Sequence, residues 1–434
     1  MGTILLYLGI TFVILLLIGV PIAYSLGIVG VGYFVLFGTD FGVLLTAPQT
    51  MVESTRSFSL AAIPFFVFIG ELMAISGISD RVVAFARAMI GHFRGGLAMV
   101  ALASSLLVAA FSGSSVANAV GTGSVTIPAM KKAGYPKDFA AAVESTSSSM
   151  GTVVPPSVAM IVYASITGVS VKALFVGGYT PAIIYALGIM LVIRVVAKRG
   201  NFGRDEKHSN KERIETFRSS IGALLIPVIV MGGILLGYMT ATEAGAIGGV
   251  YTLGLAVFVH RSLTWEKFKK VLVETARTTG IVMFVVATAS VVGWILARER
   301  VPTTLAEKTL SAFSSQTAIL IVLILMLVVL GTFMETLSAL AITAPLIVGI
   351  GMGAGIDPVL LGLVTVLSLS IGMVTPPVGV VLFVTTKIAR SSIEAVSMRL
   401  LPFLGVLVGG TLLMALFPEV FLWLPNFVES LSGS

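Results

Sequence analysis

The chain has 434 residues, of which 57% are hydrophobic and only 11% are charged, and its mean hydropathy is +1.06. A soluble core of this size does not need so much apolar surface, so the composition excludes an ordinary soluble domain and indicates a polytopic membrane protein. The net charge is +7, but the basic residues crowd the loops, which is typical of membrane topology and does not indicate nucleic-acid binding. The chain has no cysteine, which excludes disulfides and thiolate metal sites.

The first half of the chain, residues 1–197, predicts a series of membrane segments. The stretch 4–18 lacks a basic leader and a small-residue cleavage site, so we interpret it as a retained helix. In chain order we expect short helices at 4–18 and 22–37, an amphipathic segment at 40–56, a helix at 58–76, an oxygen-rich stretch with apolar flanks at 97–131, a segment broken by Pro-Pro at 139–167 and a last helix at 174–197.

The second half, residues 220–418, repeats this plan. "SSSMGTVVPPSV" at 147–158 matches "SLSIGMVTPPVG" at 368–379, an offset of 221, and "SVTIPAM" at 124–130 matches "AITAPLI" at 341–347, an offset of 217. An insertion near 351–355 would explain the difference. The corresponding segments are helices at 221–237 and 242–260, an amphipathic segment at 264–277, a helix at 279–297, an oxygen-rich stretch at 318–352, a Pro-Pro segment at 359–387 and a last helix at 400–418.

The charged residues decide how the oxygen-rich stretches cross the membrane. If 97–131 and 318–352 turn back as re-entrant hairpins, 22 of the 27 Lys and Arg residues fall on the inside and five outside. Each half then has five crossings, so the two halves lie inverted. Both chain ends are outside, the polar segment 198–219 is a cytoplasmic linker, and 419–434 is a periplasmic tail. We therefore predict an all-α polytopic protein with inverted repeats.

Inverted repeats with broken helices at matching positions are typical of secondary transporters. Non-helical backbone is tolerated within a membrane only where it lines a cavity or is buried in protein. Hairpin tips and Pro-Pro turns leave carbonyl oxygens for hard cations and helix N-termini for anions. At the offset of 217, Asn118 corresponds to Glu335, and at 221, Val154 corresponds to Thr375. We expect two pseudo-equivalent cation sites with an anionic substrate between the two tips.

At these motifs the chain resembles a known family. "SGSSVANAVGTGSVTIPAMKKAGYPKDFAAAVE", "GTVVPPS", "TEAGAIGGVY" and "IGMVTPPVG" look like the large membrane (permease) subunit, DctM-like, of tripartite ATP-independent periplasmic (TRAP) transporters. The chain is similar, more distantly, to sodium-coupled dicarboxylate carriers, whose hairpin tips carry Ser-Asn-Thr. The resemblance implies an elevator-type fold, in which a transport domain that holds both hairpins slides against the scaffold helices 4–37 and 221–260.

The resemblance also implies function and partners. We expect a sodium-coupled subunit in the bacterial inner membrane that imports an organic acid, together with a small four-helix membrane subunit and a soluble periplasmic substrate-binding protein. Sodium is the coupling ion, and no organic cofactor or other metal is expected. The carried-over sodium ligands are Ser112, Ser114, Ser115, Asn118 and Gly151 in one site and Thr332, Glu335, Thr336, Gly372 and Thr375 in the other, and the substrate residues are Ser115, Pro155, Pro156, Pro376 and Pro377.

This chain departs from the carriers' tip motif, because its first tip has Ser-Val-Ala-Asn and its second carries an acid, Glu335. Intramembrane acids are costly and usually functional, so Glu335 is the best ion-binding candidate, while Glu71, Glu144 and Glu243 are weaker ones. Glu243 follows Thr240 at an expected helix start, which favours a capping role.

Two other classes of function, and one alternative within transport, compete with this interpretation. An intramembrane serine hydrolase needs a base beside its nucleophile, and the three histidines, His92, His208 and His260, all fall in or near basic loops, so we expect no enzyme. A channel needs an open file of sites, which two occludable tips do not provide. A stand-alone sodium–dicarboxylate carrier that needs no partner stays as the alternative within transport.

Overall fold

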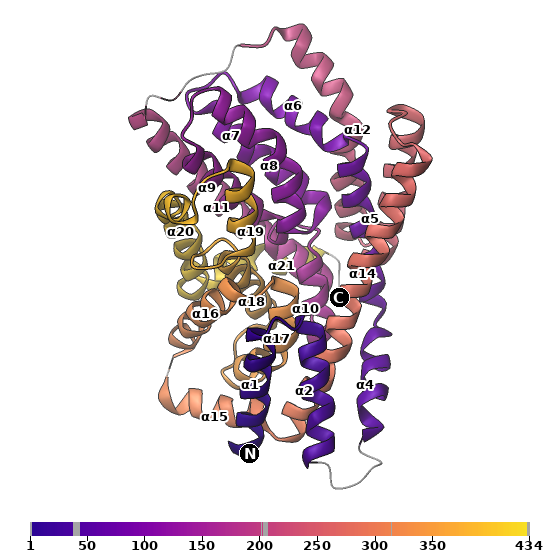
Figure 1. Cartoon of the computed structure of the whole chain (residues 1–434), viewed down its shortest axis with the longest axis vertical. Coiled ribbons are helices and arrows are strands. Elements are labelled where there is room, and N and C mark those ends of the chain that lie inside the picture. The colour runs from indigo at the N-terminus through magenta and orange to yellow at the C-terminus, as the bar shows by residue number, and fades with distance from the viewer. Residues whose placement is uncertain (1, 38–43, 201, 203–206, 314, 432–434) are drawn as a thin grey trace.

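The structure is a computed structural model that describes residues 2–37, 44–200, 202, 207–313 and 315–431, and these residues form helices without any strand (Figure 1). Within these ranges, eight helices are long and apolar enough to cross a membrane. They are Phe58–Ile75, Val171–Gly200, Asn210–Leu235, Ala241–Val259, Trp265–Arg298, Gln316–Phe333, Thr336–Gly353 and Ile393–Leu416. The all-α membrane fold predicted from the composition is confirmed.

One group of helices is organised around a long helix, α14. The members are α1 (Gly2–Leu17), α2 (Ile22–Phe37), α4 (Thr46–Thr55), η1 (Phe58–Ala61), α5 (Ala62–Ile75), α6 (Ile78–Ile90), α12 (Asn210–Leu235), α13 (Ala241–Gly254) with the π-turn η3 (Leu255–Val259), and α14 (Trp265–Arg298). Helix α14 packs against α2, α4 and α5, and α13 packs against α5 and α12. Small residues make this close packing possible: a Cβ on Gly30 would lie 2.8 Å from Val291 Cγ1, and one on Gly248 2.8 Å from Val230 Cγ2.

The second group holds both predicted hairpins and both broken helices. Its members are α7 (Gly96–Ser112), α8 (Ser115–Lys132), α9 (Lys137–Ser148), η2 (Ser149–Thr152), α10 (Val158–Thr167) and α11 (Val171–Gly200) from the first half, and α15 (Val301–Ala312), α16 (Gln316–Phe333), α17 (Thr336–Gly353), α18 (Pro358–Gly372), α19 (Val380–Ala389), α20 (Ile393–Leu416) and α21 (Pro418–Leu431) from the second. Arms α7 and α8 pack against each other, whereas α16 packs mainly against α18, and α17 against α15 and α18. The two hairpins therefore differ in how their arms are supported.

The helix that follows each break packs against the hairpin of the other half. Helix α10, which follows the first break, packs against α17 of the second hairpin, and α19, which follows the second break, packs against α8 of the first hairpin. At the α8–α19 contact, Lys131 Nζ donates to the Ala389 carbonyl over 3.0 Å. Each half thus completes the surroundings of the other half's hairpin, so the two halves form one interlocked unit.

Several expectations about element bounds were wrong. The amphipathic segment 264–277 and the helix 279–297 are a single helix, α14, because its sequence contains no proline and the polar stretch at 275–280 does not interrupt the helix. Helices α6 and α15 were missed, since both are short and carry mixed polar sequence. The segment 419–434 is helical as far as Leu431, with 432–434 outside the described residues, and 40–43 of the first amphipathic segment also lie outside them.

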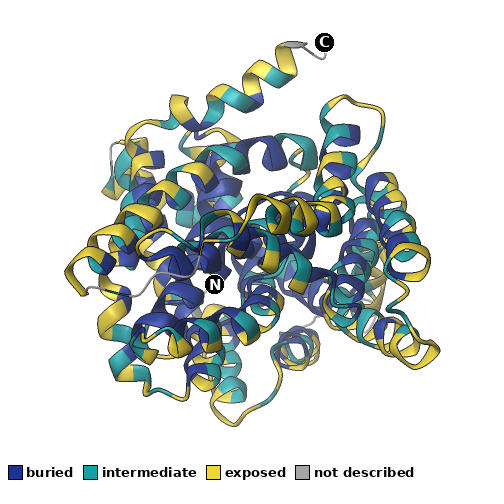
Figure 2. Ribbon diagram, turned by 90° about the horizontal axis from the view of Figure 1, so that it is seen from above, coloured by how far each residue is buried: buried dark blue, intermediate teal, exposed yellow. Residues whose placement is uncertain are grey.

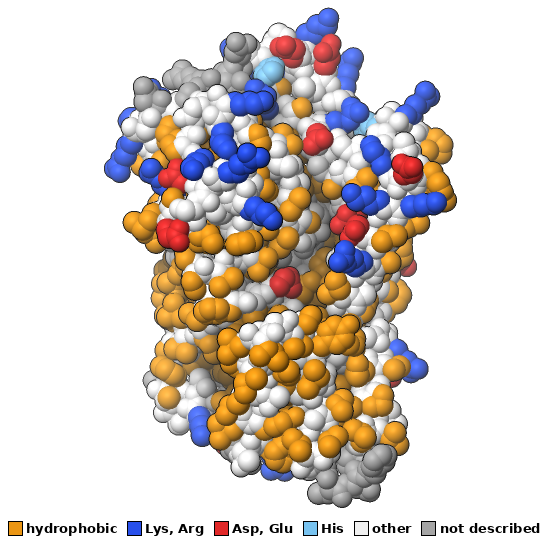
Figure 3. All heavy atoms as spheres, in the orientation of Figure 1, with side chains coloured by type: hydrophobic (Ala, Val, Ile, Leu, Met, Phe, Trp, Pro, Cys, Tyr) orange, Lys and Arg blue, Asp and Glu red, His pale blue; other side chains and the backbone are white. Residues whose placement is uncertain are grey.

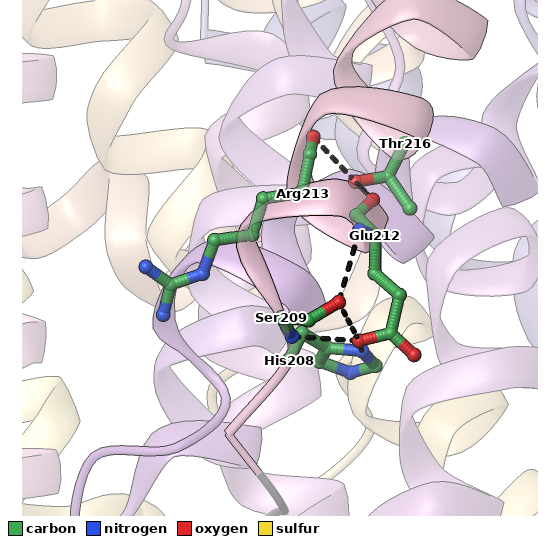
Figure 4. A network of polar contacts seen from close by, with 5 residues as sticks. All are labelled: His208, Ser209, Glu212, Arg213 and Thr216. Atoms are coloured by element: carbon green, nitrogen blue, oxygen red, sulfur yellow. Dashed lines mark hydrogen bonds and ion pairs between the residues drawn. The ribbon is translucent and has the colours of Figure 1, made fainter.

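The linker 198–219 is shorter than expected because helices extend into it from both sides. Helix α11 continues to Gly200, and α12 already begins at Asn210. Figure 4 shows why α12 begins there: Ser209 Oγ accepts the Glu212 N–H (3.3 Å), and Glu212 Oε2 accepts the Ser209 N–H (2.6 Å). His208 Nδ1 lies 3.6 Å from the same carboxylate oxygen. This capping box satisfies backbone groups that the first helical turn leaves free.

Element bounds also correct the alignment of the two halves. Helices α8 and α17 begin at Ser115 and Thr336, which is already an offset of 221 at the hairpin tips. The insertion therefore precedes the second hairpin and is not near 351–355, and the offset of 217, which aligns Pro128 with Pro345, does not hold. Ser114 and Glu335 occupy the same place, each as the N-cap of the outgoing arm, so Asn118 does not correspond to Glu335.

The surface has the pattern of a membrane protein. Buried residues gather between the helices and exposed ones lie at the rim (Figure 2), where large apolar side chains such as Leu191, Leu325 and Val329 face outward. In Figure 3, hydrophobic side chains cover the lower part of the visible face, and Lys and Arg side chains gather towards the opposite end, around α6 and the start of α12. Helix α1 starts at the end far from this basic surface, whereas α12 starts within it, so the two helices run in opposite directions (Figure 1).

Candidate functional site

The first hairpin turns at Gly113. This glycine has φ +59°, the left-handed conformation that a helix C-terminus favours and that other residues adopt only at a cost. The next residue, Ser114, is extended, and its Oγ accepts the Ala117 N–H over 3.4 Å as the N-cap of α8. The oxygen-rich sequence is thus needed locally, because it ends one helix and begins the next within two residues.

The first break is a 3₁₀ turn followed by a non-helical turn at residues 153–157. Helix α9 ends at Ser148, η2 spans Ser149–Thr152, and a cis Pro155–Pro156 bond precedes α10. Ser157 Oγ accepts the Met160 N–H (3.4 Å) as the N-cap of α10 and donates to the Thr152 carbonyl (2.7 Å). Since prolines donate no N–H, the carbonyls of this turn are satisfied by side chains instead of helix bonds.

The first tip lies directly on the first break. Ser115 Oγ donates to the Ser149 carbonyl over 3.1 Å and lies 3.2 Å from Thr152 Oγ1. A Cβ on Gly151 would lie only 2.6 Å from the Ser114 carbonyl oxygen, so glycine is required for this approach. Ser112 Oγ is buried and has no hydrogen-bond partner among the residues that the structure describes. Four of the five predicted ligands of the first site, Ser112, Ser114, Ser115 and Gly151, therefore lie together.

Asn118, the fifth, is fully buried one turn into α8. Its Nδ2 donates to the Ser105 carbonyl in α7 over 3.0 Å, which ties the two arms of the hairpin together. Its amide oxygen is 3.5 Å from Thr122 Oγ1. The Asn118 side chain therefore helps to hold the hairpin together, and its amide oxygen makes only the weak 3.5 Å contact with Thr122 among the described residues.

The second tip has the same plan with different chemistry. Glu335 caps α17: its Oε2 accepts the N–H groups of Leu337 (2.9 Å) and Ser338 (3.3 Å). Thr332 Oγ1 donates to the Val329 carbonyl (2.7 Å), and the Thr332 carbonyl accepts the Gly379 N–H (3.0 Å) from beyond the second break. The carboxylate thus does what the Ser114 hydroxyl does in the first half, with a negative charge added at the positive end of α17.

The second break meets the second tip through two glycines. A Cβ on Gly372 would lie 2.4 Å from Gly331 backbone, and one on Gly331 would lie 2.6 Å from the Leu369 carbonyl oxygen. Thr336 Oγ1 donates to Met373 Sδ (2.7 Å), and Thr375 Oγ1 donates to the Ile371 carbonyl (2.7 Å). The predicted ligands of the second site are therefore also brought together around one backbone crossing.

The predicted substrate residues do not share one environment. Pro155 and Pro156 are buried beside the first tip, whereas Pro376 is half-buried and Pro377 is exposed. Pro376 and Pro377 are again joined by a cis bond and stand 221 positions after Pro155 and Pro156. The two breaks thus share the cis Pro-Pro bond at matching positions, but the prolines of the first break are buried and those of the second are partly or fully exposed.

One polar contact joins the two breaks at the centre of the molecule. Thr152 Oγ1 donates to Ser370 Oγ over 2.6 Å, and Ser370 Oγ donates to the Ser149 carbonyl over 2.9 Å. Ser149 therefore accepts bonds from the first tip, through Ser115, and from the second half, through Ser370. Sequence reasoning missed Ser149, Thr152 and Ser370, although all three flank the paired Pro-Pro motifs.

Glu144 is a further group that sequence reasoning ranked low. Its side chain is fully buried in α9 and is bonded by four hydroxyl groups, from Ser105, Thr122, Thr126 and Ser148. The sequence does signal this residue, because Glu144 is an acid inside a predicted membrane segment, and acids in such segments are rare and usually functional. Glu243, by contrast, closes a capping box with Thr240, which confirms its expected capping role.

A cavity in the described part of the chain lies apart from both tips. It has a volume of about 730 Å³ between α6, α7 and α11 and is lined by apolar side chains with Arg94, Arg194 and Lys198. None of the predicted sodium or substrate residues lines it.

Known proteins match the whole chain. A family model described as "Tripartite ATP-independent periplasmic transporter, DctM component" matches residues 9–420. The chain is 35% identical over 98% of its length to the sialic acid TRAP transporter large permease protein SiaM of Vibrio cholerae, covering 98% of that protein. It is 36% identical over 95% of its length to the C4-dicarboxylate TRAP transporter large permease protein DctM of the same organism, covering 96% of it.

Solved structures show the fold. MtrF of Neisseria gonorrhoeae, described as one of a class of antimetabolite efflux pumps, superposes with a TM-score of 0.62 over 88% of this chain and 85% of that one, at 13% identity. The YdaH transporter of Alcanivorax borkumensis gives 0.57 over 88% and 90%, at 16% identity. The helical transporter architecture and the whole-length family match agree, and the chain belongs to the DctM family, the large permease subunits of tripartite ATP-independent periplasmic transporters.

Proposed function

We propose that this chain imports an organic acid anion, driven by sodium, together with a small membrane subunit and a periplasmic substrate-binding protein. Membership of the family makes the chain a transporter permease subunit and not an enzyme. The names of its relatives supply the substrate class, since they refer to sialic acid and to C4-dicarboxylates, and both of these are organic acids.

The observation that carries sodium coupling is the pair of tip–break crossings. Each crossing gathers hydroxyl and carbonyl oxygens, which are the ligands that hard cations prefer. The first site would use Ser112, Ser114, Ser115, Asn118 and Gly151, and the second Thr332, Glu335, Thr336, Gly372 and Thr375. The unpartnered Ser112 hydroxyl supports the first, and the Glu335 carboxylate, which has only backbone N–H partners, supports the second.

The anion would lie between the two tips. Helices α8 and α17 begin at the tips, and α10 and α19 begin just after the breaks, so four helix N-termini converge on this region. Backbone N–H groups and the helix dipole favour an anion at such positions. Ser115, Pro155, Pro156, Pro376 and Pro377 would border the substrate, because prolines remove competing N–H donors and shape the turn.

The charge distribution supports the orientation. The end that carries most Lys and Arg side chains (Figure 3) would be cytoplasmic, which puts the start of α1 on the periplasmic side. Helix α11 carries Lys198 and Arg199 in its last turn, so its opposite end is periplasmic in this arrangement. Pro425 of α21 lies 3.3 Å from the position of a Gly177 Cβ near that end, so α21 would be on the periplasmic side too.

An elevator motion is consistent with the grouping of the helices. Helices α1 and α2 share a hydrophobic cluster with α4 and α14, and this cluster also includes Val301 of α15 and Ala341 of α17, whereas α12 and α13 belong to the main core that holds both hairpins. The interlocked hairpins and broken helices would then move as one body against the predicted scaffold helices, while α14, which contacts both, supports the interface.

Reconstituted uptake tests the proposal. The chain would be co-purified with its small subunit, placed in liposomes and supplied with the cognate binding protein and labelled organic acids, with and without an inward sodium gradient. We expect uptake only when sodium and the binding protein are both present. Sodium-driven uptake without the binding protein would favour a stand-alone carrier, and uptake indifferent to sodium would contradict the two cation sites.

A further inference from the structure

Glu144 is the one charged side chain that is fully buried among the residues that the structure describes. It lies in the middle of α9, between both arms of the first hairpin. A Cβ on Gly123 of α8 would already lie 3.1 Å from Glu144 Cγ, so the packing leaves little space beside the carboxyl group. A buried carboxylate without a compensating charge is expensive, and such groups take up a cation or a proton.

Four hydroxyl groups from three helices saturate this carboxyl group. Oε1 is bonded by Ser105 Oγ of α7 (3.2 Å), by Ser148 Oγ of α9 (3.0 Å) and by Thr122 Oγ1 of α8, and Oε2 is bonded by Thr126 Oγ1 (2.5 Å). Hydroxyl groups can donate to an ionised carboxylate and can also accept the O–H of a protonated one. These four hydroxyl groups form a hydroxyl cage around Glu144. The cage therefore fits both the ionised and the protonated carboxyl group without moving the backbone.

Charged groups on the neighbouring helices do not reach Glu144. Helix α7 and η2 carry no Asp, Glu, Lys, Arg or His. On α9 itself and on the other elements packed against it, the charged residues lie in the first or last turns of the helices or near them. They are Lys131 and Lys132 of α8, Lys137 and Asp138 of α9, Lys387 of α19, Glu394 and Arg399 of α20, and Lys172, Arg194, Lys198 and Arg199 of α11. Lys131 and Lys137 donate to the carbonyls of Ala389 and Arg390 at the C-terminal end of α19, and Arg399 pairs with Asp138 at 2.8 Å. The tyrosines of α11 include Tyr185, which bonds Thr411.

The cage is joined directly to the first tip. The Ser105 carbonyl accepts Asn118 Nδ2 (3.0 Å), and Thr122 Oγ1 lies 2.8 Å from the Asn118 carbonyl. Ser148 precedes Ser149, whose carbonyl accepts Ser115 Oγ. A change in the charge of Glu144 therefore reaches the proposed sodium ligand Asn118 through one intervening residue, Ser105 or Thr122, and Ser115 through two, Ser148 and Ser149.

We propose that Glu144 is a proton-binding site whose charge state sets the sodium affinity of the first tip. A proton from water adds to one carboxylate oxygen, which becomes a neutral acid that donates to a cage hydroxyl. A proton needs no ligand sphere and no space, whereas a second metal ion would need both. The ionised form attracts a cation at the tip, so sodium binding and protonation oppose each other, and by linkage sodium binding releases the proton. The coupling part rests on the proposed sodium function, and the proton site does not.

Infrared difference spectroscopy tests the proton site without transport. The purified permease complex would be titrated from acid to alkaline pH in sodium-free buffer, and the carbonyl stretch of a protonated carboxylic acid would be followed. We expect a band that disappears on raising the pH, that is absent in Glu144→Gln, that returns at a shifted frequency in Glu144→Asp, and that persists in the control Glu335→Gln. A band unchanged in Glu144→Gln would overturn the proposal, as would a titration in which only the Glu335 variant loses signal.

Sodium dependence of uptake at several pH values tests the coupling. The wild-type complex should need about tenfold less sodium for half-maximal uptake for each unit of pH gained across the titration range, and Glu144→Gln should show no such pH dependence. Equal pH dependence in both proteins would refute the coupling even if the infrared band is assigned to Glu144. Wild-type uptake that ignores sodium would instead refute the proposed function, while the infrared result would still decide the proton site.

Discussion

Thr152 Oγ1 and Ser370 Oγ lie 2.6 Å apart, and this bond joins the broken helix of one half to that of the other. The two residues are 218 positions apart in the chain. Both are buried, and Ser370 Oγ also bonds the Ser149 carbonyl, which receives Ser115 from the first tip. The central contact of the molecule is therefore a hydroxyl relay that passes from the second half, through the first break, to the first tip.

Removing this relay should weaken the protein and slow transport. Thr152→Val and Ser370→Ala each leave a buried polar atom without its partner, so each should lower the free energy of unfolding by about 1–3 kcal/mol. Thermal unfolding of the detergent-purified protein measures the loss, and a double-mutant cycle measures the coupling between the two hydroxyls. Thr365→Val is the matched control, because Thr365 is equally buried and bonds only Leu361 O within its own helix. Additive effects of the two substitutions would contradict a direct bond.

The glycines at the tip–break crossings should tolerate no side chain. In Gly151→Ala and Gly372→Ala the new Cβ meets backbone atoms at 2.6 and 2.4 Å, which cannot move aside as a flexible side chain can. We expect loss of most uptake activity because tip and break are forced apart. Gly405→Ala provides the control, since nothing lies within 4 Å of its Cβ position in α20. Uptake in Gly151→Ala equal to that in the control would show that the crossing is not needed.

The two proposed sodium sites should respond differently to mutation. Glu335→Gln keeps an oxygen that can cap α17 but removes the charge, so protein stability should change little while the sodium concentration for half-maximal uptake rises about tenfold or more. Asn118→Ala also breaks the bond to Ser105 O, so it should reduce both stability and sodium affinity. Uptake as a function of sodium, combined with thermal unfolding, separates the two effects. Unchanged sodium dependence in both variants would remove these residues from the sites.

The orientation can be measured cleanly because the chain contains no cysteine. A single cysteine at Lys211, near the start of α12, should react with a membrane-impermeant maleimide only after the cytoplasmic side is opened. A cysteine at Lys308 of α15 should react in intact spheroplasts. The Lys211 variant controls for leaky membranes. The opposite labelling pattern would invert the topology deduced from the basic residues.

Local sequence predicted the breaks well because proline and glycine act on their own backbone. The Pro-Pro pairs interrupt the helices after Thr152 and after Gly372, and Gly113 reverses the chain at the first tip, as their conformational limits require. The alignment of the two halves failed at the tips for a related reason. Pro128 and Pro345 are both inside helices, and matching them gave the wrong offset, because a helix tolerates a proline at several places when neighbouring helices support it.

By itself the sequence determined that the chain is an all-helical membrane protein with two matching halves, each with an oxygen-rich tip and a Pro-Pro break. These features follow from the amino-acid composition, from the repeat in the sequence and from the restricted backbone of proline and the free backbone of glycine, all of which can be read without knowing which residues meet in space. Only the tertiary structure decided that α10 packs against the other half's hairpin, that Ser370 bonds Ser149 and Thr152, and that Glu144 is enclosed by hydroxyls from three helices. Contacts between helices far apart in the chain depend on how their surfaces pack, and no residue encodes its distant partner in its own sequence neighbourhood.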